Sequence, residues 1–349
     1  MSRIAIVTGA NGWLGRTLTG FLCEGYPDHP DLVESRYDEV RCLVLQNEDT
    51  GFLQNLSGKV RIFHGDITKQ KSLTEAFATD REFDLYHTAG IVHPRNVRQF
   101  YEVNHVGAVN VLDQACDNKI RKAVVVSSNS PLGCNPFPDH LFDEDSPYHP
   151  YMNYGKSKFK MELSVREVAE KNQVSLTLIR CPWFYGPNQP PRQTVFLSMI
   201  KDGKMPVVGD GSNMRSMSYL DNLCQGIMLA AQKTASAPDV YWIADENPYS
   251  MNDIVDTIES LLERDFGYAV QHRRLRLPWV AGEVATLCDW LIQGLGFYHQ
   301  KIHVLSEMNK SIACSIDRAK AGLDYRPQIE LREGMKRSIQ WCLDNNLEI

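Results

Sequence analysis

Short apolar runs alternate with longer amphipathic stretches through the first half of the chain. The apolar runs predict buried strands at 3–8, 40–45, 60–64, 84–87, 122–128 and 174–180. Helix-length patterns follow these runs, including Val97–Cys116 and a stretch that begins near Tyr154. Strands that alternate with helices imply a parallel sheet covered by helices on both faces, so the sequence predicts an α/β fold with a doubly wound, Rossmann-type sheet.

The pattern becomes less regular after residue 180, and the chain contains no internal repeat, low-complexity run or flexible linker. Its most apolar later stretch, Pro278–Tyr298, contains Glu283 and Asp289 and predicts an amphipathic helix rather than a transmembrane one. We expect Trp279 and Trp290 within this stretch to pack the C-terminal part or to line an apolar pocket.

A glycine-rich turn follows the first predicted strand. It reads Gly9-Ala10-Asn11-Gly12-Trp13-Leu14-Gly15 and leads directly into a helical pattern. Glycines permit a tight turn and a close approach of the backbone to a diphosphate, and the following helix points its N-terminal amides at the negative charge. The spacing differs from the common GxGxxG, but the position between a strand and a helix favours dinucleotide binding.

Tyr154 and Lys158 are four residues apart, so on a helix they share one face. A tyrosine has an unperturbed pKa of about 10, and a neighbouring ammonium is expected to lower it toward the operating range. Ser128, at the end of a predicted strand, can hydrogen-bond the substrate oxygen whose proton Tyr154 handles. The same pattern also occurs by chance on surface helices, so its weight depends on the rest of the chain.

The end of the second strand is where a carboxylate would hold the ribose of NAD, or an arginine the extra phosphate of NADP. Here the strand ends in Leu45-Gln46-Asn47, which offers neither. Arg16 and Arg41 are alternative phosphate partners, although Arg41 can equally lie along the strand. The cofactor is therefore NADP or NAD, with a slight preference for NADP.

Composition narrows the class of protein. The chain has 349 residues, a net charge of -6 and nine cysteines. The net charge argues against general binding to nucleic acid or to an anionic membrane. The cysteines form no CxxC pair or metal-ligand spacing, so they predict reduced packing residues and no metal site. These features, with no recognisable signal peptide, predict a cytoplasmic enzyme with no membrane span.

With these motifs in place, the chain resembles the extended short-chain dehydrogenases/reductases, which include the NAD-dependent epimerases/dehydratases and a 3β-hydroxysteroid-dehydrogenase-like branch. The matching segments run in the family's order through nearly the whole chain: 8–15, 65–66, 87–90, Asn104, 127–128, 154–158, 180–187, 209–211, 219–222 and 317–327.

The resemblance implies roles for individual residues. The catalytic set would be Ser128, Tyr154 and Lys158, supported by Asn104. The cofactor would contact Gly9, Asn11, Gly12, Trp13, Leu14, Gly15, Asp66, Ile67, Thr88, Ala89, Gly90, Tyr154, Lys158 and Pro182. The substrate would contact His93, Asn129, Trp183 and Arg215, although a histidine at His93 or His87 is more often a local hydrogen-bonding residue.

The resemblance also implies the organisation of the protein. Residues 1–180 would form the dinucleotide-binding Rossmann domain and residues 181–349 mainly a smaller substrate-binding lobe, with some segments returning to the Rossmann core. A homodimer is expected, because in extended members the helices equivalent to Val97–Cys116 and Tyr151–Asn172 pair across a two-fold axis. Apolar residues beyond those one face needs agree with this: Val103, Val106, Val109 and Leu112.

Three functions remain open. The favoured one is an NAD(P)-dependent oxidoreductase that acts on a secondary alcohol or ketone, a small-molecule substrate. The second is a sugar-nucleotide epimerase or dehydratase, and the third is a dinucleotide-binding regulator without turnover. In the sugar-nucleotide epimerases that this loop resembles, an asparagine contacts the diphosphate. Trp183 occupies that position here, which favours an apolar substrate, whereas Arg215 favours a sugar nucleotide.

Overall fold

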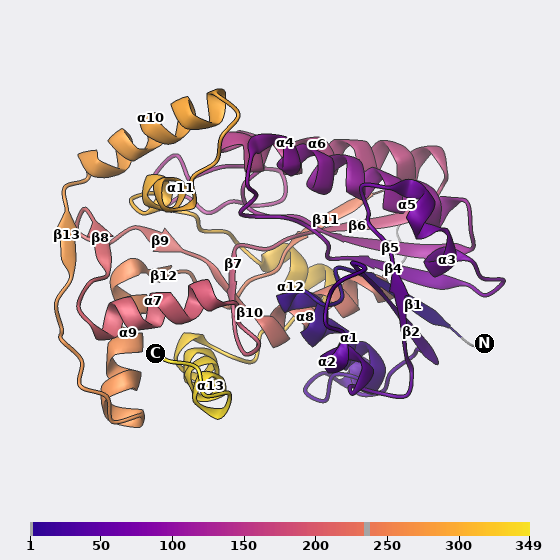
Figure 1. The fold of residues 1–349 in the computed structure, drawn as a ribbon, viewed down its shortest axis with the longest axis horizontal. Coiled ribbons are helices and arrows are strands. Elements are labelled where there is room, and N and C mark those ends of the chain that lie inside the picture. Colours follow the sequence, from indigo (N-terminus) through magenta and orange to yellow (C-terminus); the bar gives the residue numbers. More distant parts are fainter. Residues whose placement is uncertain (1–2, 234–237) are drawn as a thin grey trace.

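The computed structural model describes residues 3–233 and 238–349. Its centre is a sheet of seven strands in the order β11-β6-β5-β4-β1-β2-β3 (Figure 1), and every pair of neighbouring strands is parallel. The strands are β1 (Ile4–Thr8), β2 (Glu39–Val44), β3 (Val60–His64), β4 (Phe83–His87), β5 (Ile120–Val126), β6 (Ser175–Arg180) and β11 (Asp239–Trp242). The predicted Rossmann-type sheet is confirmed.

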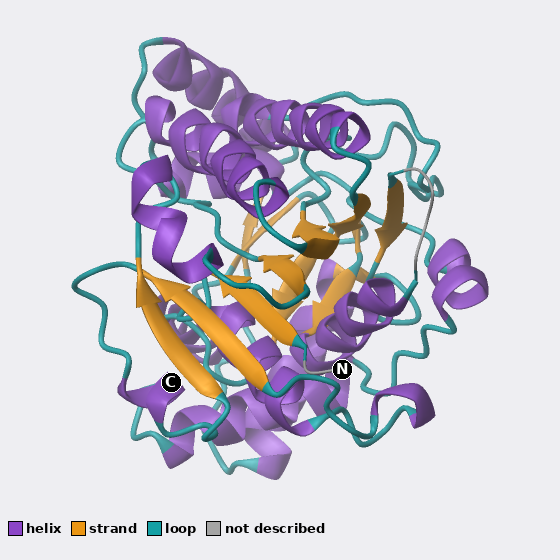
Figure 2. Cartoon of the chain, turned by 90° about the vertical axis from the view of Figure 1, so that its right-hand side faces the viewer, coloured by secondary structure: helices purple, strands orange, loops and turns teal. Residues whose placement is uncertain are grey.

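Helices cover both faces of this sheet, as its buried strands require. Successive side chains of a strand point to opposite faces, so Ala5 and Val7 of β1 belong to one apolar core and Ile4 and Ile6 to the other. The first core is closed by α1 (Trp13–Glu24), α8 (Leu220–Gln232) and α12 (Asp317–Leu323), and the second by α3 (Thr74–Phe77), α5 (Ala108–Cys116) and α6 (Met152–Lys171). Figure 2 shows the strands between the two groups of helices.

The helix predicted at Val97–Cys116 is present but not uniform. It consists of α4 (Val97–Gln99), the π-helical segment η3 (Phe100–Gly107) and α5. Single turns of π-helix inside α-helices are often found at functional sites. Shorter elements complete this half of the chain: η1 (Pro30–Leu32), α2 (Gly51–Gln54) and η2 (Gln70–Leu73).

The C-terminal half divides its residues between the sheet and a second group of elements. β11, α8 and α12 lie on the central sheet, most of the others surround a separate apolar core, and α10 and α11 pack against each other, with α10 also on α6. Its strands pair in twos, β10 with β7, β12 with β9 and β13 with β8. These elements are β7 (Trp183–Tyr185), α7 (Pro191–Lys201), β8 (Pro206–Val208), β9 (Met214–Arg215), β10 (Met217–Tyr219), β12 (Tyr249–Ser250), α9 (Met251–Ser260), η4 (Leu261–Asp265), β13 (Leu275–Leu277), α10 (Val280–Gly294), α11 (Gln300–Glu307) and α13 (Leu331–Asp344). The division into domains at residue 180 stays a prediction.

The strand order determines where a ligand can bind. The chain builds the sheet outward from β1 to β3 on one side and from β4 to β6 on the other, so the direction of winding reverses between β1 and β4. Thr8 at the end of β1 lies beside Leu43 of β2 and His87 of β4, which aligns the carboxyl ends of these strands. In open α/β sheets this edge, at the reversal, is the usual place for a ligand.

The helix expected within Pro278–Tyr298 is α10, but its orientation differs from the prediction. Trp279 and Trp290 are 63% and 59% exposed, so neither packs a core or lines a pocket. Small and polar side chains of α10 face the protein instead, as described below. Within the described residues, no helix is both long and apolar enough to cross a membrane.

Candidate active site

The glycine turn between β1 and α1 leaves no room for side chains. A Cβ atom on Gly15 would lie 2.1 Å from the carbonyl oxygen of Gly9, and one on Gly9 would lie 2.7 Å from the backbone of Ala89. Gly9 also has a φ of 69°, in the left-handed region. Gly12 caps α1 without a side-chain hydrogen bond, so the first amides of the helix remain available to an anion.

The other residues of this turn are held by protein contacts. Trp13 donates its indole N–H to the carbonyl of Pro187 at 2.7 Å and packs against Phe184. Asn11 donates to the carbonyl of Asp49 at 2.9 Å, and Leu14 is buried in the core. Trp13 and Leu14 thus shape the turn through packing, and their predicted contact with a cofactor is a proposal.

Ser128 and Tyr154 meet at the end of the sheet. Ser128 follows β5, and Tyr154 lies in the first turn of α6, whose N-terminus stands over the same edge. The Ser128 hydroxyl lies close enough to the Tyr154 hydroxyl to oppose the rise in the pKa of Tyr154. Ser128 also donates to the side chain of Asn129 at 3.3 Å, so the structure brings these three residues together.

Lys158 is buried one turn after Tyr154 on α6, but the lowered pKa expected for Tyr154 is absent. Burial raises the pKa of Tyr154 above its usual value, and only the Ser128 hydroxyl and the charge of Arg192 oppose this. The Lys158 ammonium instead donates to the carbonyl of Val126 at 3.0 Å. Burial lowers the pKa of Lys158 itself to about 8, so this group is mostly protonated at neutral pH.

Asn104 joins three segments of the site from the π-helical segment η3. Its side chain accepts a hydrogen bond from the Ile91 amide at 2.8 Å, and donates to the Ile91 carbonyl and to Ser157 at 3.0 and 3.2 Å. A Cβ on Gly90 would lie 3.3 Å from the Asn104 oxygen and 3.6 Å from the Lys158 nitrogen. Asn104 therefore fixes the loop after β4 against α6 and leaves a narrow space over Gly90.

The residues at the end of β4 hold that loop in place. His87 is buried, its Nδ1 lies 2.7 Å from the Thr8 hydroxyl, and its pKa falls to about 3, mainly through burial and further through Lys158. A neutral, hydrogen-bonded His87 is the local structural residue that the sequence favoured. Thr88 donates to the Thr8 carbonyl at 2.8 Å, so it connects the ends of β1 and β4.

A cavity of about 480 Å³ opens at the carboxyl ends of β2 and β3. Leu45, Glu48, Asp66 and Lys69 line it, together with neighbouring loop residues. Asp66 accepts hydrogen bonds from Thr68 that help hold its pKa below the usual value against the opposing effect of burial. Ile67 is buried beside it and accepts a hydrogen bond from Asn110.

The shape of the site and its hydrogen-bond donors therefore suit a dinucleotide. Bare glycines and free helix amides lie where a diphosphate needs close approach, and the cavity beside Asp66 lies on the β2–β3 side, where an adenosine would bind. Gly90 and Lys158 lie toward Tyr154, where the nicotinamide end would face the substrate. Pro182 is buried in the next loop, after β6.

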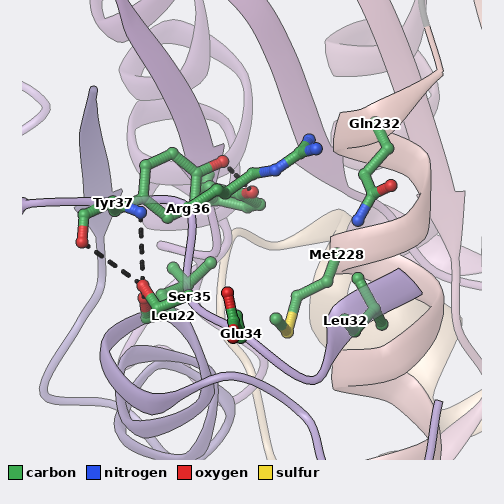
Figure 3. A pocket seen from close by; sticks show the side chains of 9 residues that line it. Leu22, Leu32, Glu34, Ser35, Arg36, Tyr37, Met228 and Gln232 are labelled. Atoms are coloured by element: carbon green, nitrogen blue, oxygen red, sulfur yellow. Dashed lines mark hydrogen bonds between the residues drawn. The ribbon is translucent and has the colours of Figure 1, made fainter. Parts of the chain in front are cut away.

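A second cavity is too small to compete with this site (Figure 3). Leu22, Leu32, Ser35, Tyr37 and Met228 are among the residues that line it, between α1, η1 and α8. Its volume of about 10 Å³ holds at most one water molecule.

The substrate side of Tyr154 is built from aromatic rings. Phe100 packs against Tyr154 with ring centres 5.7 Å apart, and Tyr298 packs edge-on against Phe100 at 5.3 Å. His93 lies 2.7 Å from the Tyr298 hydroxyl, and its pKa falls to about 4, mainly through burial and further through Arg192 and His303. His93 is thus near the predicted position, and its contact with substrate remains a proposal.

Two arginines lie near this wall, one of which sequence reasoning missed. Arg192, at the start of α7, is close enough to Tyr154 and Tyr298 to interact electrostatically, and it forms no salt bridge within the described residues. Arg215 on β9 donates to the Glu307 carbonyl, while its Nε is buried without a partner there. Trp183 packs edge-on against Phe196. Arg192 follows a proline-rich loop, and only the fold brings it to Tyr154.

A metal centre is not indicated. Among residues 3–233 and 238–349, no group of three or more histidine, cysteine or acidic side chains could hold a metal ion. The nine cysteines are free, and most are buried.

Fold and site together define a protein of the dinucleotide-binding Rossmann class. A family model described as NAD dependent epimerase/dehydratase family matches residues 5–244. The chain belongs to this family, and its relatives indicate an NAD-dependent epimerase, dehydratase or dehydrogenase.

Three curated relatives illustrate the range of that family. The uncharacterized protein y4nL of Sinorhizobium fredii is 47% identical over 98% of this chain and 96% of the relative. The N-acetyl-alpha-D-glucosaminyl-diphospho-ditrans,octacis-undecaprenol 4-epimerase of Escherichia coli O157:H7 is 30% identical over 64% of this chain and 66% of its own. The 3beta-hydroxysteroid-dehydrogenase/decarboxylase isoform 1 of Arabidopsis thaliana is 25% identical over 97% and 79%.

Solved structures agree on the fold. DesIV, a dTDP-glucose 4,6-dehydratase of Streptomyces venezuelae with NAD and TYD bound, superimposes with a TM-score of 0.75 over 98% of both chains, at 24% identity. The UDP-glucuronic acid 4-epimerase of Bacillus cereus in complex with NAD gives 0.73, at 20% identity, over 98% of this chain and 99% of its own.

Proposed function

We propose that the protein transfers a hydride between a nicotinamide dinucleotide and a substrate carbon that carries a hydroxyl or keto group. The bound nicotinamide supplies or accepts the hydride. Tyr154 exchanges the proton of the substrate oxygen, and Ser128 hydrogen-bonds the same oxygen. The observation that carries this proposal is the placing of Ser128 and Tyr154 at one edge of the sheet, with the Lys158 nitrogen and Asn104 beside the bare Gly90.

The state of Tyr154 matters for this role. Its raised pKa keeps the hydroxyl protonated, which suits the donation of a proton to a carbonyl oxygen undergoing reduction. In the opposite direction a base is required, and the Ser128 hydroxyl and the positive charge of Arg192 are the groups that favour the phenolate over the neutral form. We also expect Lys158 to donate a hydrogen bond to the ribose of the cofactor, and the other predicted cofactor residues to hold the rest of the dinucleotide.

For the substrate, we favour an apolar or modestly polar secondary alcohol or ketone, with net oxidation or reduction. Phe100, which contacts Tyr154, and Tyr298, which contacts Phe100, offer apolar ring surface near the reacting oxygen. This corresponds to the activity named for the 3β-hydroxysteroid-dehydrogenase relative. A regulator without turnover is less well supported, because a binding module does not need Ser128, Tyr154 and Lys158 together.

A second candidate is epimerisation of a sugar linked to a diphosphate. Within the part of the chain that the structure describes, Arg192 has no salt bridge and the Nε of Arg215 has no partner, so both are cationic groups that could hold phosphate oxygens. Several relatives carry names of this kind.

One experiment separates the two candidates. The purified chain is incubated with NAD⁺ or NADP⁺ and either apolar secondary alcohols or nucleotide sugars, while nicotinamide absorbance and the NMR spectrum of the substrate are followed. Stoichiometric reduction of nicotinamide by an alcohol supports the oxidoreductase. A sugar that is epimerised without net change in absorbance, with UDP or dTDP binding lost in Arg215→Ala, supports the second candidate. No turnover with either class contradicts both.

A further inference from the structure

Helix α10 carries its apolar side chains on the face that points away from the protein. They recur at the spacing of one helix face, and we call them the α10 apolar face: Trp279, Val280, Val284, Leu287, Trp290 and Leu291. All are more than one-third exposed, and Leu295 just after the helix is 76% exposed. In Figure 1, α10 is an outermost element of the molecule. Contiguous exposed apolar surface of this kind marks an interaction site.

Polar contacts on the opposite face hold α10 in this orientation. Gln293 accepts hydrogen bonds from Asn153 of α6 at 3.0 Å and donates to Asp289 at 2.9 Å. Asp289 in turn lies 2.7 Å from Nδ1 of His303 on α11. If the helix were turned to bury its leucines, these hydrogen bonds would break and their buried partners on α6 and α11 would face apolar side chains. The outward apolar face is therefore built into the fold.

Charges around the α10 apolar face are mainly positive, with the exposed Asp210 near Arg276 as an acidic neighbour. Arg276 precedes the helix by four residues, Lys301 follows it on α11, and Arg95 adjoins Asn96, which pairs with Phe297 at the end of the helix. All three side chains belong to exposed residues without a salt bridge in the described chain. The acidic Glu283 on α10 is neutralised by Lys310. A second copy of the chain would bring the same positive rim against itself, whereas anionic lipid headgroups complement it.

We propose that the α10 apolar face docks on the surface of an anionic lipid bilayer. An apolar stripe bearing tryptophans and bordered by basic residues is the pattern of a helix that lies in the membrane interface without crossing it. The local positive charge outweighs the net charge of -6 at this surface, because headgroup attraction falls off within a Debye length.

The docked face adjoins the active site. Tyr298 directly follows the apolar segment and is separated from Tyr154 only by the ring of Phe100. If the proposed function holds, docking turns the aromatic side of the site toward the bilayer, which suits a substrate with a lipid or other apolar body. Docking itself does not depend on the proposed function, and its test does not use activity.

The test is flotation of the full chain with vesicles of phosphatidylcholine alone or mixed with phosphatidylglycerol. We expect binding to the anionic vesicles that weakens as salt is raised. Leu287→Glu/Leu291→Glu should reduce it at least about tenfold, because two apolar side chains no longer enter the interface. The control Val33→Glu/Leu347→Glu makes the same change at two exposed apolar positions outside α10 and should bind as the wild type does.

Circular dichroism and light scattering without vesicles accompany the flotation. Wild-type secondary structure is expected in both variants, because all four side chains are exposed. Absence of binding to any vesicle, or equal binding by the α10 variant, would overturn the proposal. The proposal would also be overturned if the wild type did not bind vesicles and the α10 variant had a different oligomeric state, because the α10 apolar face would then join two copies of the chain. Vesicle binding by a protein with no hydride-transfer activity would contradict only the proposed function.

Discussion

Arg180 at the end of β6 donates two hydrogen bonds to Glu162 of α6, at 3.2 and 2.9 Å, and both side chains are almost completely buried. Glu162 also accepts hydrogen bonds from Ser127 and Tyr148, each at 2.6 Å. It lies one turn beyond Lys158, on the helix face that carries Tyr154. This ion pair therefore fastens the helix that bears Tyr154 to the two strand ends beside Ser128.

Replacing Glu162 should destabilise the fold strongly. Glu162→Gln leaves the guanidinium of Arg180 buried without a compensating charge, and breaking a buried pair in this way costs about 3–5 kcal/mol. Urea unfolding measures the change. Glu167→Gln, at an exposed position on the same helix, is the matched control and should be nearly neutral. A loss below about 1 kcal/mol in Glu162→Gln would show that Arg180 finds another partner.

The same pair makes stability depend on pH. Burial alone would raise the pKa of Glu162, but Arg180 and the hydrogen bonds outweigh it and hold the pKa below its usual value. The contribution of the carboxylate is therefore complete above the pKa of an unfolded glutamate, about 4.3. It is lost as the pH falls through the lower folded value. The difference between wild type and Glu162→Gln should shrink over this acid range.

Removing the hydroxyl of Tyr154 should abolish most turnover. Tyr154→Phe takes away the group that exchanges the proton, so we expect a loss of at least about 10²-fold with retained cofactor binding. Steady-state kinetics and a cofactor titration measure the two effects. Tyr268→Phe, in the loop after η4, is the control. Near-wild-type turnover in Tyr154→Phe would exclude the proposed mechanism.

The glycine turn allows a test within one helix. Gly15→Ala places a methyl group 2.1 Å from the Gly9 carbonyl, so the turn must distort, and we expect cofactor affinity to fall beyond detection. Gly20→Ala, further along α1, has its nearest neighbour at 4.0 Å and should bind normally. It should even gain about 0.5–1 kcal/mol of stability, since alanine favours a helix. Calorimetry with the cofactor distinguishes the pair.

Cofactor choice depends on the cavity beside β2. Arg41 contacts Glu39 and the carbonyls of Ala76 and Ala78, so it is not free to hold a phosphate. Glu48 lines the cavity and would repel a 2′-phosphate, whereas the Lys69 ammonium in the same lining is paired with Asp66. We therefore expect NAD⁺ to bind at least about tenfold more tightly than NADP⁺, against the slight preference drawn from the sequence. In a titration with both cofactors, Glu48→Gln should reduce the difference between the affinities for NAD⁺ and NADP⁺. Tighter binding of NADP⁺ than of NAD⁺ by the wild type would contradict the expected preference.

The homodimer remains to be tested. Val106 and Leu163 are exposed on the helices expected to pair, whereas Leu112 is buried in the chain's own core and cannot contribute. Light scattering at micromolar concentration should give twice the 39.7 kDa of one chain. Val106→Glu/Leu163→Glu should give the single-chain mass. A wild-type mass near that of one chain would exclude the dimer.

Local features of the sequence determined the sheet and the main features of the site. Strand positions follow from apolar runs, and the predicted ends lie within two residues of β1 to β6. The glycine turn and the shared face of Tyr154 and Lys158 depend on spacing along the chain, which periods of two and 3.6 residues convert directly into geometry. Glu162 lies four residues after Lys158 on the same helix face, and this spacing could have indicated its buried position next to the site.

Only the tertiary structure decided the features that arise from burial and from distant segments. Burial in a low-dielectric site raises the pKa of Tyr154, an effect that the nearby lysine alone did not predict. Arg192 lies near Tyr154, and Tyr298 packs against the ring of Phe100 that covers Tyr154, from segments 38 and 144 residues away; no local pattern encodes this proximity. The spacing of apolar residues in α10 predicted a helix correctly, but spacing alone does not determine whether the apolar face is buried or exposed. The buried contacts of Asp289 and Gln293 determine that its leucines face outward.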